Sequence, residues 1–544
     1  CIRDRYIMGN RIITAAFAAL SMLSATAFAE NLVPNKPSKG PNIWCTWGVQ
    51  NGVGGEQAKK VRETVKREIA FEGDQGGGAD FARSCINEDL IFGENGWVNF
   101  WPEIRKDVYM LLDDGWDVPY NTPAKKSEAF GSFELDEKKF PSCTGDPAQR
   151  LKTLNKMLKK RGWRGAAVWI AAQAKGESWR SKLSPEGLRE YWKQRVLWSK
   201  KAGVSYWKVD WGVHGHEPEF RKMLSELANK YYPKLYVEHA VPSSPLNDFD
   251  IKTMQGSGEF SKTKPKILSI VDDTVKFSNV FRTYDTLNPI KSTTTIDRAA
   301  YELASGWKSG SRAIISVEDN MSLSVGLGAA VGIMRWDNIA HDSGARWVVI
   351  RAVLWQRIAP AVPMNELEIF VSKERLEDEW TFKPNTIWYA PAWGKTVKQS
   401  APAVVSRGIE NPKVKPRNGR NMQPYVQATL HPNGSFALSM TPRMTADSDR
   451  IHNPCADVDV NLDCLNRKIC LFGVNGDVSF KLGTDKQVEV LAQDLLEKEA
   501  IDVSDKVRIS GGKLTVPANL GKKVVKLRKG DWTEAYVLLV REKK

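Results

Sequence analysis

The chain has 544 residues, of which 42% are hydrophobic, and a formal net charge of +15. This length exceeds what a single hydrophobic core usually serves, so two or more domains are expected. The 79 Lys and Arg residues are mixed among 64 Asp and Glu residues, and no basic block with interleaved aromatic residues indicates a nucleic-acid partner. An evenly solvated surface is favoured over a basic one that attracts acidic polymers.

The first 29 residues have the pattern of a secretory signal. A Met8 start, the basic Arg11, an apolar run over residues 12–28 and small residues at Ala27 and Ala29 predict cleavage after Ala29. The seven residues before Met8 are interpreted as an upstream start. No later stretch reaches the roughly 20 apolar residues of a membrane span. The mature protein is therefore expected in the periplasm or outside the cell, with no membrane span.

Short β-rich runs alternate with helical patterns from about residue 40 to 340, which is typical of βα units and a parallel sheet. The last of the eight runs has a Gly/Ala-rich start that is equally compatible with a helix. The expected strands lie within residues 42–50, 107–116, 165–173, 204–212, 234–241, 279–285, 312–319 and 328–337. Eight such units predict a (β/α)8 TIM barrel over residues 30–362.

Two of the intervening helices have clear boundaries. Asp146 and Pro147 open the first, and Gly162 ends it. The second opens at Ser184 and ends at Gly203, just before the fourth strand. Both patterns support the alternation of strand and helix.

Beyond residue 363 the pattern changes to short alternating segments with turn residues, which predicts a C-terminal antiparallel β-sandwich over residues 363–544. Residues 425–430 and 435–440 form a predicted hairpin, and residues 535–540 a closing strand. The polar segment 398–421, rich in Pro, Arg and Asn, is expected to be a long loop.

Six cysteines follow residue 29, and none has the paired spacing of a zinc site. The three late ones lie close enough in sequence for one local disulfide, although their connectivity cannot be assigned. They are Cys45, Cys85, Cys143, Cys455, Cys464 and Cys470. We interpret all six as structural.

Acidic residues stand at the ends of several predicted strands, where barrel enzymes carry their chemistry. The second strand ends at Asp113 and Asp114, the fourth at Asp210, the fifth at Glu238, the sixth at Asp285, and the seventh at Glu318 and Asp319. Several carboxyl groups are therefore expected to meet at one end of the barrel.

Lys208 and Asp210 are two residues apart, so both side chains should face the same side of the fourth strand. A neighbouring cation favours the ionised carboxylate that a nucleophile requires. An ordinary ion pair at a strand end is the alternative. Asp113 and Asp114 can share a pocket only where their strand ends, and Gly115 permits that turn; a plain turn is the alternative here.

Arg282 and Asp285 flank the end of the sixth strand, where a cation can orient one group while a carboxyl protonates a leaving oxygen. Tryptophans beside the strand ends could stack on sugar rings or simply pack. They are Trp44, Trp47, Trp116 and Trp211.

Taken in order, the WxxW of the first strand, LLDDGW, the FP at residues 140–141, YWKVDWG, the glutamate of the fifth strand and FRTYD resemble the melibiase-type glycoside hydrolases of families 27 and 36. The resemblance covers about residues 42–340. It implies a retaining exo-acting α-galactosidase with Asp210 as nucleophile and Asp285 as acid and then base.

The resemblance also implies binding roles around the sugar. Asp113 and Asp114 would hold its 4- and 6-hydroxyls, Lys208 its ring hydroxyls, and Trp47 would line the pocket. Residues near the 2-hydroxyl would be Arg282 and Glu238, and Asp319 is expected among the substrate-binding residues. The partner is a carbohydrate.

The family needs no cofactor or metal, so His214, His216 and Glu217 are interpreted as a polar loop, with a metal site as the alternative. Other galacto-configured sugars, such as a β-L-arabinopyranoside, are an alternative substrate. A non-catalytic carbohydrate-binding protein is the alternative from another class. The oligomeric state and the natural glycan are not indicated by the sequence.

Overall fold

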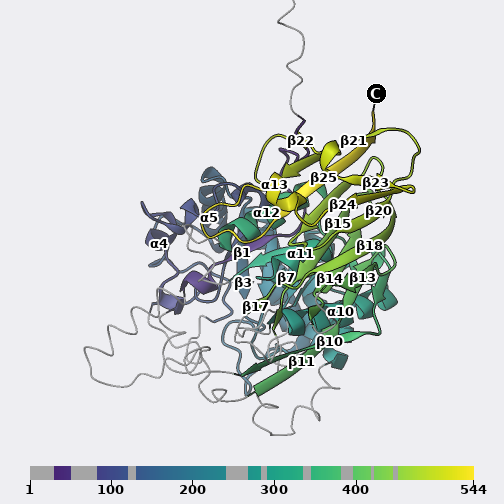
Figure 1. The fold of residues 1–544 in the computed structure, drawn as a ribbon. Helices are drawn as coiled ribbons and strands as arrows, with labels where there is room; N and C mark the ends of the chain where they lie inside the picture. The colour runs from purple at the N-terminus through teal and green to yellow at the C-terminus, as the bar shows by residue number, and fades with distance from the viewer. Residues whose placement is uncertain are drawn as a thin grey trace, which may run out of the picture.

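A computed structural model describes the protein, and its elements are shown in Figure 1. The described residues are 30–50, 82–120, 130–240, 268–283, 291–334, 345–381, 396–417, 422–444 and 451–543. The predicted signal and the predicted acid Asp285 lie outside them. Among the described helices, none is both long and apolar enough to cross a bilayer.

The first part of the chain forms a closed barrel of eight parallel strands in sequential order, so the predicted fold class is confirmed. Each predicted strand is present, including the ambiguous last one. The strands are β1 (Ile43–Cys45), β2 (Tyr109–Leu112), β3 (Ala166–Ile170), β4 (Tyr206–Val209), β5 (Tyr236–His239), β6 (Val280–Thr283), β7 (Ile314–Glu318) and β8 (Ala330–Ile333).

Helices surround this barrel and join its strands. They are α4 (Glu88–Phe92), α5 (Pro147–Lys160), α6 (Pro185–Ala202), α7 (Pro218–Tyr231), α10 (Lys291–Ser309), α11 (Met321–Gly326) and α12 (Ala345–Ile358). The predicted caps are confirmed: Asp146 forms a capping box on α5, and Ser184 caps α6. Gly203 ends α6 with a φ of 71°, a conformation that favours glycine.

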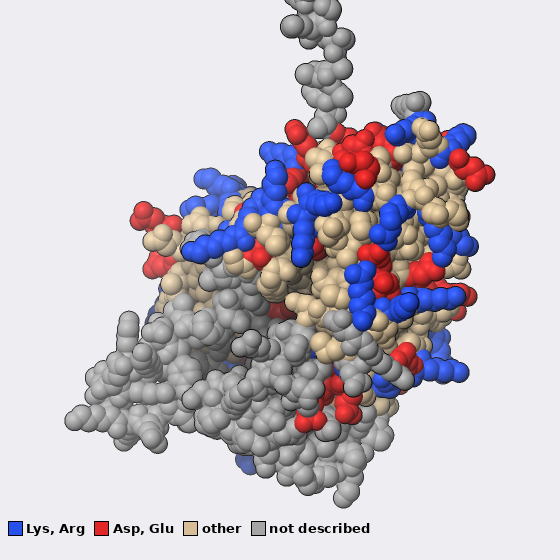
Figure 2. Space-filling model, in the orientation of Figure 1, with Lys and Arg blue, Asp and Glu red and all other residues tan. Residues whose placement is uncertain are grey.

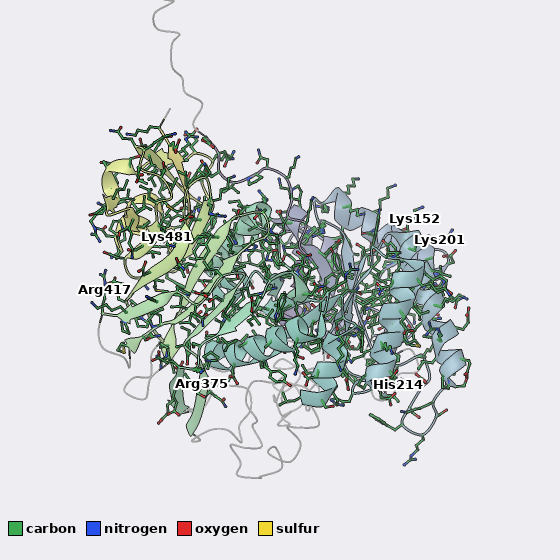
Figure 3. The ribbon with its side chains drawn as sticks, turned by 90° about the vertical axis from the view of Figure 1, so that its right-hand side faces the viewer. Lys152, Lys201, His214, Arg375, Arg417 and Lys481 are labelled. Atoms are coloured by element: carbon green, nitrogen blue, oxygen red, sulfur yellow. The ribbon has the colours of Figure 1, made fainter. Side chains whose placement is uncertain are left out.

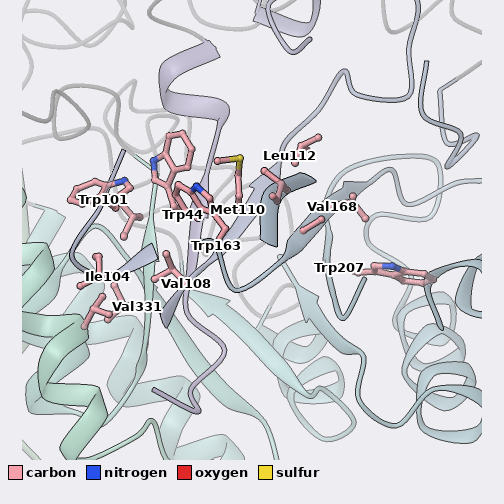
Figure 4. Packing of buried hydrophobic residues seen from close by; sticks show 14 of the residues in the cluster. Trp44, Trp101, Ile104, Val108, Met110, Leu112, Trp163, Val168, Trp207 and Val331 are labelled. Atoms are coloured by element: carbon pink, nitrogen blue, oxygen red, sulfur yellow. The ribbon is translucent and has the colours of Figure 1, made fainter. Parts of the chain in front are cut away.

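Strand alternation divides the barrel residues between two environments. Ile43 and Cys45 face the barrel interior, where they pack with Tyr109 and Tyr206. Trp44, between them, belongs to the separate core under the helices. Figure 4 shows Trp44 in this outer core together with its neighbours Trp101, Met110 and Trp163. The inward-facing residues are the ones that lead to the mouth of the barrel, at the carboxyl ends of its strands.

The C-terminal part is a β-sandwich with a shared core, in which Phe436 and Phe480 meet across the two sheets. The larger sheet contains β22 (Ile501–Asp502), β21 (Val488–Asp494), β25 (Ala535–Glu542), β19 (Lys468–Phe472), β15 (Phe436–Thr441), β14 (Tyr425–Leu430), β12 (Val404–Arg407) and β9 (Ile369–Val371) in that order. The smaller contains β13 (Lys413–Pro416), β18 (Ala456–Asp463), β20 (Val478–Lys481), β24 (Lys513–Val516) and β23 (Arg508–Ser510).

Most sandwich neighbours run antiparallel, and three pairs, β12 with β14, β15 with β19 and β18 with β20, run parallel. The predicted hairpin is the antiparallel pair β14 and β15. Two small sheets pair β10 (Arg375–Thr381) with β11 (Thr396–Pro402), and β16 (Arg443–Met444) with β17 (Ile451–His452). A short helix, α13 (Leu520–Val524), precedes the last strand.

The predicted long loop over residues 398–421 is wrong, because its described part contains the end of β11 and the strands β12 and β13. Val404 and Val405 are buried in the larger sheet, so β12 is an inner strand despite its polar surroundings. The lysines and proline of β13 suit an edge strand, where one side of the backbone has no strand partner.

A buried ion-pair cluster joins barrel and sandwich. Arg351 of α12 contacts Asp494 at 3.2 Å and Asp531 at 2.6 Å. Nearby, Gly326 of α11 lies against Ser439 and Gln427, where a Cβ would collide with both side chains.

In Figure 2 the exposed charges of both signs are interspersed over the described surface. All six cysteines of the described residues are free thiols, so the proposed local disulfide is absent from the structure.

Candidate active site

Charged side chains fill the barrel interior near the carboxyl ends of its strands, next to a layer of aromatic and aliphatic residues. Lys208, Glu238 and Arg282 lie within their strands, and Asp113 and Asp210 follow the last residues of β2 and β4. Lys208 pairs in register with Trp169 on one side and with Glu238 on the other, so these three side chains occupy one level of the barrel. This is the mouth at which barrel enzymes carry their chemistry.

Asp210 lies at the centre of a first hydrogen-bonded group. Its Oδ2 accepts a hydrogen bond from the indole nitrogen of Trp169 at 3.0 Å and lies 3.4 Å from the ammonium of Lys208. Lys208 also bonds Oδ2 of Asp113 at 2.8 Å, and the thiol of Cys45 donates to the same oxygen at 2.9 Å. The prediction that Lys208 and Asp210 share one side of β4 is confirmed by this geometry.

The backbone of Asp210 is fixed as firmly as its carboxylate. Arg221 of α7 is fully buried and donates to the carbonyl oxygens of Val209, Asp210 and Ala240 at 2.9–3.1 Å. These bonds tie the end of β4 to the end of β5. Because Arg221 holds two strand ends together, it positions the carboxylate without touching it.

A second group crosses the barrel from β4 to β7. Arg282 lies between two buried glutamates, with Nε 2.7 Å from Glu238 and Nη1 2.6 Å from Glu318. The phenol of Tyr206 donates to the other oxygen of Glu238 at 2.5 Å. Burial raises the pKa of Glu318 to about 7, helped by Asp319 and opposed by Arg282. The guanidinium of Arg282 is therefore the cation that stabilises these two buried glutamates in the folded protein.

Asp113 and Asp114 take different partners, although both are buried. Asp113 contacts Lys208, whereas Asp114 forms an ion pair with Arg83 at 2.9 Å. Gly115 has a φ of 114°, and a Cβ there would collide with the backbone of Arg83. Burial raises the pKa of Asp114 to about 6, while Arg83 lowers it. The turn that Gly115 permits thus sends the two carboxyl groups to separate cations.

The tryptophans at the strand ends separate into two kinds. Trp44 and Trp116 are fully buried, with Trp44 stacked on Trp163 and Trp116 bonded to the carbonyl of Trp169, so they are packing residues. Trp47 and Trp211 are half-buried and pack against the interior cluster. Their rings are thus partly accessible, unlike those of Trp44 and Trp116.

Asp319 has an uncommon backbone. Its φ of 52° places it in the left-handed region, which a non-glycine residue occupies at a cost. Its carboxylate accepts the backbone N–H of Met334 at 2.9 Å, and its own N–H donates to Gly332. These bonds hold Asp319 across the ends of β7 and β8, which keeps the predicted binding residue at the rim.

The histidine loop is held in place by acidic residues. Among the described residues, no group of three or more potential ligands is arranged for a metal ion. His214 instead lies between Glu177 at 3.3 Å and Glu217 at 2.6 Å. Burial lowers the pKa of His214, but its two glutamate partners outweigh burial and raise it. Figure 3 shows His214 on the side of the barrel away from the β-sandwich, at the opposite end from Lys201.

Several residues of the site were not predicted from the sequence, namely Cys45, Arg83, Trp169, Tyr206 and Arg221. Strand alternation contained a signal for two of them, because Cys45 follows the inward Ile43 by two residues and Tyr206 precedes Lys208 by two. Arg83 and Arg221 both lie in helical segments, so no strand pattern could reveal them.

A buried acid beside the site makes a pH-dependent contribution to stability. Burial and then the nearby Asp114 raise the pKa of Asp117 from 3.8 to about 7. Between these values the unfolded chain loses a proton that the folded protein keeps, so this acid lowers the free energy of unfolding as the pH rises. Urea denaturation of Asp117→Asn and of the parent protein at about pH 5 and about pH 7 measures this effect. The fall in the free energy of unfolding between the two pH values should be about 2 kcal/mol smaller in Asp117→Asn.

The exposed Asp485 offers a matched control, because Asp485→Asn removes the same charge without changing a buried acid. Its decline with pH should equal that of the parent protein. Equal declines in Asp117→Asn and the parent would contradict a raised pKa at Asp117.

No family model and no curated protein matches the chain. Solved structures similar to it include a family 27 β-L-arabinopyranosidase from Geobacillus stearothermophilus, with 10% identity, a TM-score of 0.38, and coverage of 92% of this chain and 97% of the other. An α-galactosidase from Saccharomyces cerevisiae has 10% identity, a TM-score of 0.37, and coverage of 92% and 99%. For α-galactosidase I from Mortierella vinacea the values are 10%, 0.35, 92% and 96%. At this level of identity, the likeness concerns the fold alone.

Proposed function

We propose that the protein is a retaining exo-acting glycoside hydrolase that releases terminal α-linked galactose. The observation that carries this proposal is the setting of Asp210. Its side chain is 15% exposed, whereas the ion-paired side chains of Asp113, Asp114 and Glu318 are at most 3% exposed. Of these four acids, Asp210 is thus the one that a substrate can reach.

The proposed reaction has two displacements. The carboxylate of Asp210 attacks the anomeric carbon, and the bond from that carbon to the leaving oxygen breaks as an acid protonates the oxygen. Water then attacks the same carbon, loses a proton to the conjugate base, and frees Asp210. Asp285 is assigned this acid and base role from the sequence, where it follows the last residue of β6 by two positions.

The environment of Asp210 suits a group that must be held in place for attack. Lys208 supplies a cation 3.4 Å away, and the Trp169 N–H holds one oxygen in place. Both interactions hold the carboxylate in a fixed position. Because Lys208 also binds Asp113, it aligns a second carboxylate at the same level, where hydroxyl groups of the sugar can be held.

A panel of aryl glycosides tests the proposed activity and its substrate. Hydrolysis of the α-D-galactoside is expected, with the released sugar initially in the α configuration. Preference for the β-L-arabinopyranoside would keep the chemistry and change the sugar. Binding of these glycosides without hydrolysis of any of them would instead indicate a non-catalytic carbohydrate-binding protein and would overturn the proposal.

A further inference from the structure

An exposed tryptophan stands on the loop that follows β3. Trp179 is 74% exposed, which is the highest value among the large apolar side chains of the described residues. The ammonium of Lys182 lies 5.6 Å from the centre of its ring. A ligand that covered this aromatic surface would therefore gain free energy from its removal from water.

The loop is held in one shape by a buried carboxylate. Glu177, whose side chain is 2% exposed, accepts hydrogen bonds from the backbone N–H groups of Ala174 at 2.6 Å and Leu183 at 2.8 Å. Ser178 and Ser181 exchange backbone hydrogen bonds at 2.9 and 3.1 Å. Trp179 therefore occupies the tip of a closed turn, so the backbone that carries its ring has little conformational freedom to lose on binding.

The same loop is attached to the loop that follows Asp210. His214 joins them, because its ring contacts Glu177 and its backbone N–H donates to Ala172 at 2.8 Å. Lys182 adds an ion pair with Glu217 at 2.8 Å. The rim that displays Trp179 is thus continuous with the segment that begins at the nucleophile.

On the other side, the rim continues into the loop after β2. The phenol of Tyr191 donates to the carbonyl of Gly131 at 2.7 Å and accepts the N–H of Lys175. Gly131 has a φ of 80°, and a Cβ there would collide with the carbonyl of Gln173. Three neighbouring loops therefore form one packed rim beside the mouth.

We propose that Trp179 is a stacking platform for a sugar unit beyond the terminal one, so that the substrate is an oligosaccharide or polysaccharide. This inference rests on the proposed function, in which the mouth holds only the terminal sugar and the remaining chain leaves across the rim. The flat apolar face of a pyranose ring matches an exposed indole. Lys182 and the adjacent Arg180 offer donors to its hydroxyl groups.

Trp179→Ala tests the platform with two substrates that differ only outside the terminal sugar. We expect kcat/KM for a galactosyl oligosaccharide of three or more units to fall about tenfold. The rate on α-galactosyl fluoride, whose leaving group is a single atom, should stay unchanged. Trp179→Phe should recover most of the loss, because it restores an aromatic face.

Trp532, 60% exposed on the β-sandwich, provides the matched control, and Trp532→Ala should alter neither rate. Unchanged kinetics in Trp179→Ala with the oligosaccharide, or equal losses on both substrates, would overturn the inference. Calorimetric titration with the same oligosaccharide separates this result from failure of the proposed function. If the parent binds it without turnover and Trp179→Ala binds it about tenfold more weakly, the platform stands while the catalytic proposal falls. Equal binding of the oligosaccharide by the parent and Trp179→Ala would show that Trp179 is not a stacking platform, whether or not the protein is an enzyme.

Discussion

Replacing Asp210 by Asn is expected to lower kcat on an activated aryl α-galactoside by about four to six orders of magnitude, as loss of a catalytic nucleophile does elsewhere. The amide keeps the size of the carboxylate and an oxygen for the Trp169 N–H, but it cannot form the glycosyl ester. Steady-state kinetics of the purified variant measure the effect.

Asp117→Asn is a suitable control for Asp210→Asn, because it makes the same chemical change at a buried acid close to the site. Its kcat should remain near that of the parent protein. The folded state of Asp210→Asn can be verified by its urea transition. A correctly folded Asp210→Asn protein with full activity would exclude Asp210 as the nucleophile.

Replacing Arg282 by Met is expected to lower the free energy of unfolding by about 3–5 kcal/mol, the cost of removing one partner from a buried ion pair. The side chain of Arg282 is fully buried, and both of its ion-pair partners, Glu238 and Glu318, are almost completely so. Without the guanidinium, two acids would share a low-dielectric interior, and the pKa of Glu318 should rise further above about 7. Urea denaturation near neutral pH measures the loss.

Two further variants decide the cause of that loss. Arg375→Met removes an ion pair with Asp297 in which both side chains are more than 40% exposed, and it should cost at most about 1 kcal/mol. Adding Glu318→Gln to Arg282→Met should restore part of the stability, because one buried charge is then removed. Equal stability of Arg282→Met and the parent would contradict the proposed role of the guanidinium.

The barrel was predictable because short buried β-rich runs alternate with helical patterns along the chain. Period-two alternation also placed Lys208 and Asp210 on one side of β4, where the structure has them. The same alternation, applied to β1, would have assigned Trp44 to the outer core, because Ile43 and Cys45 face inward. Strand alternation can therefore distinguish a tryptophan that faces the helices from one that faces the barrel interior, which residue type alone cannot do.

The pairing of acids with cations was not predictable, because it depends on contacts between distant segments. Asp114 pairs with Arg83 of a distant helical segment, and Arg282 of β6 pairs with both Glu238 of β5 and Glu318 of β7. The error over residues 398–421 has a related cause: strand β12 is buried through its neighbours in the sheet, and polar flanking residues conceal that burial.

Chemical rescue of Asp210→Gly with azide tests the central claim most directly. Small anions can enter the space of the lost carboxylate and attack the anomeric carbon of an activated aryl α-galactoside from the same face. If Asp210 is the nucleophile, azide should restore turnover and the product should be β-galactosyl azide, identified by NMR. Formation of α-galactosyl azide, or an absence of rescue in a folded variant that retains ligand binding, would contradict the assignment.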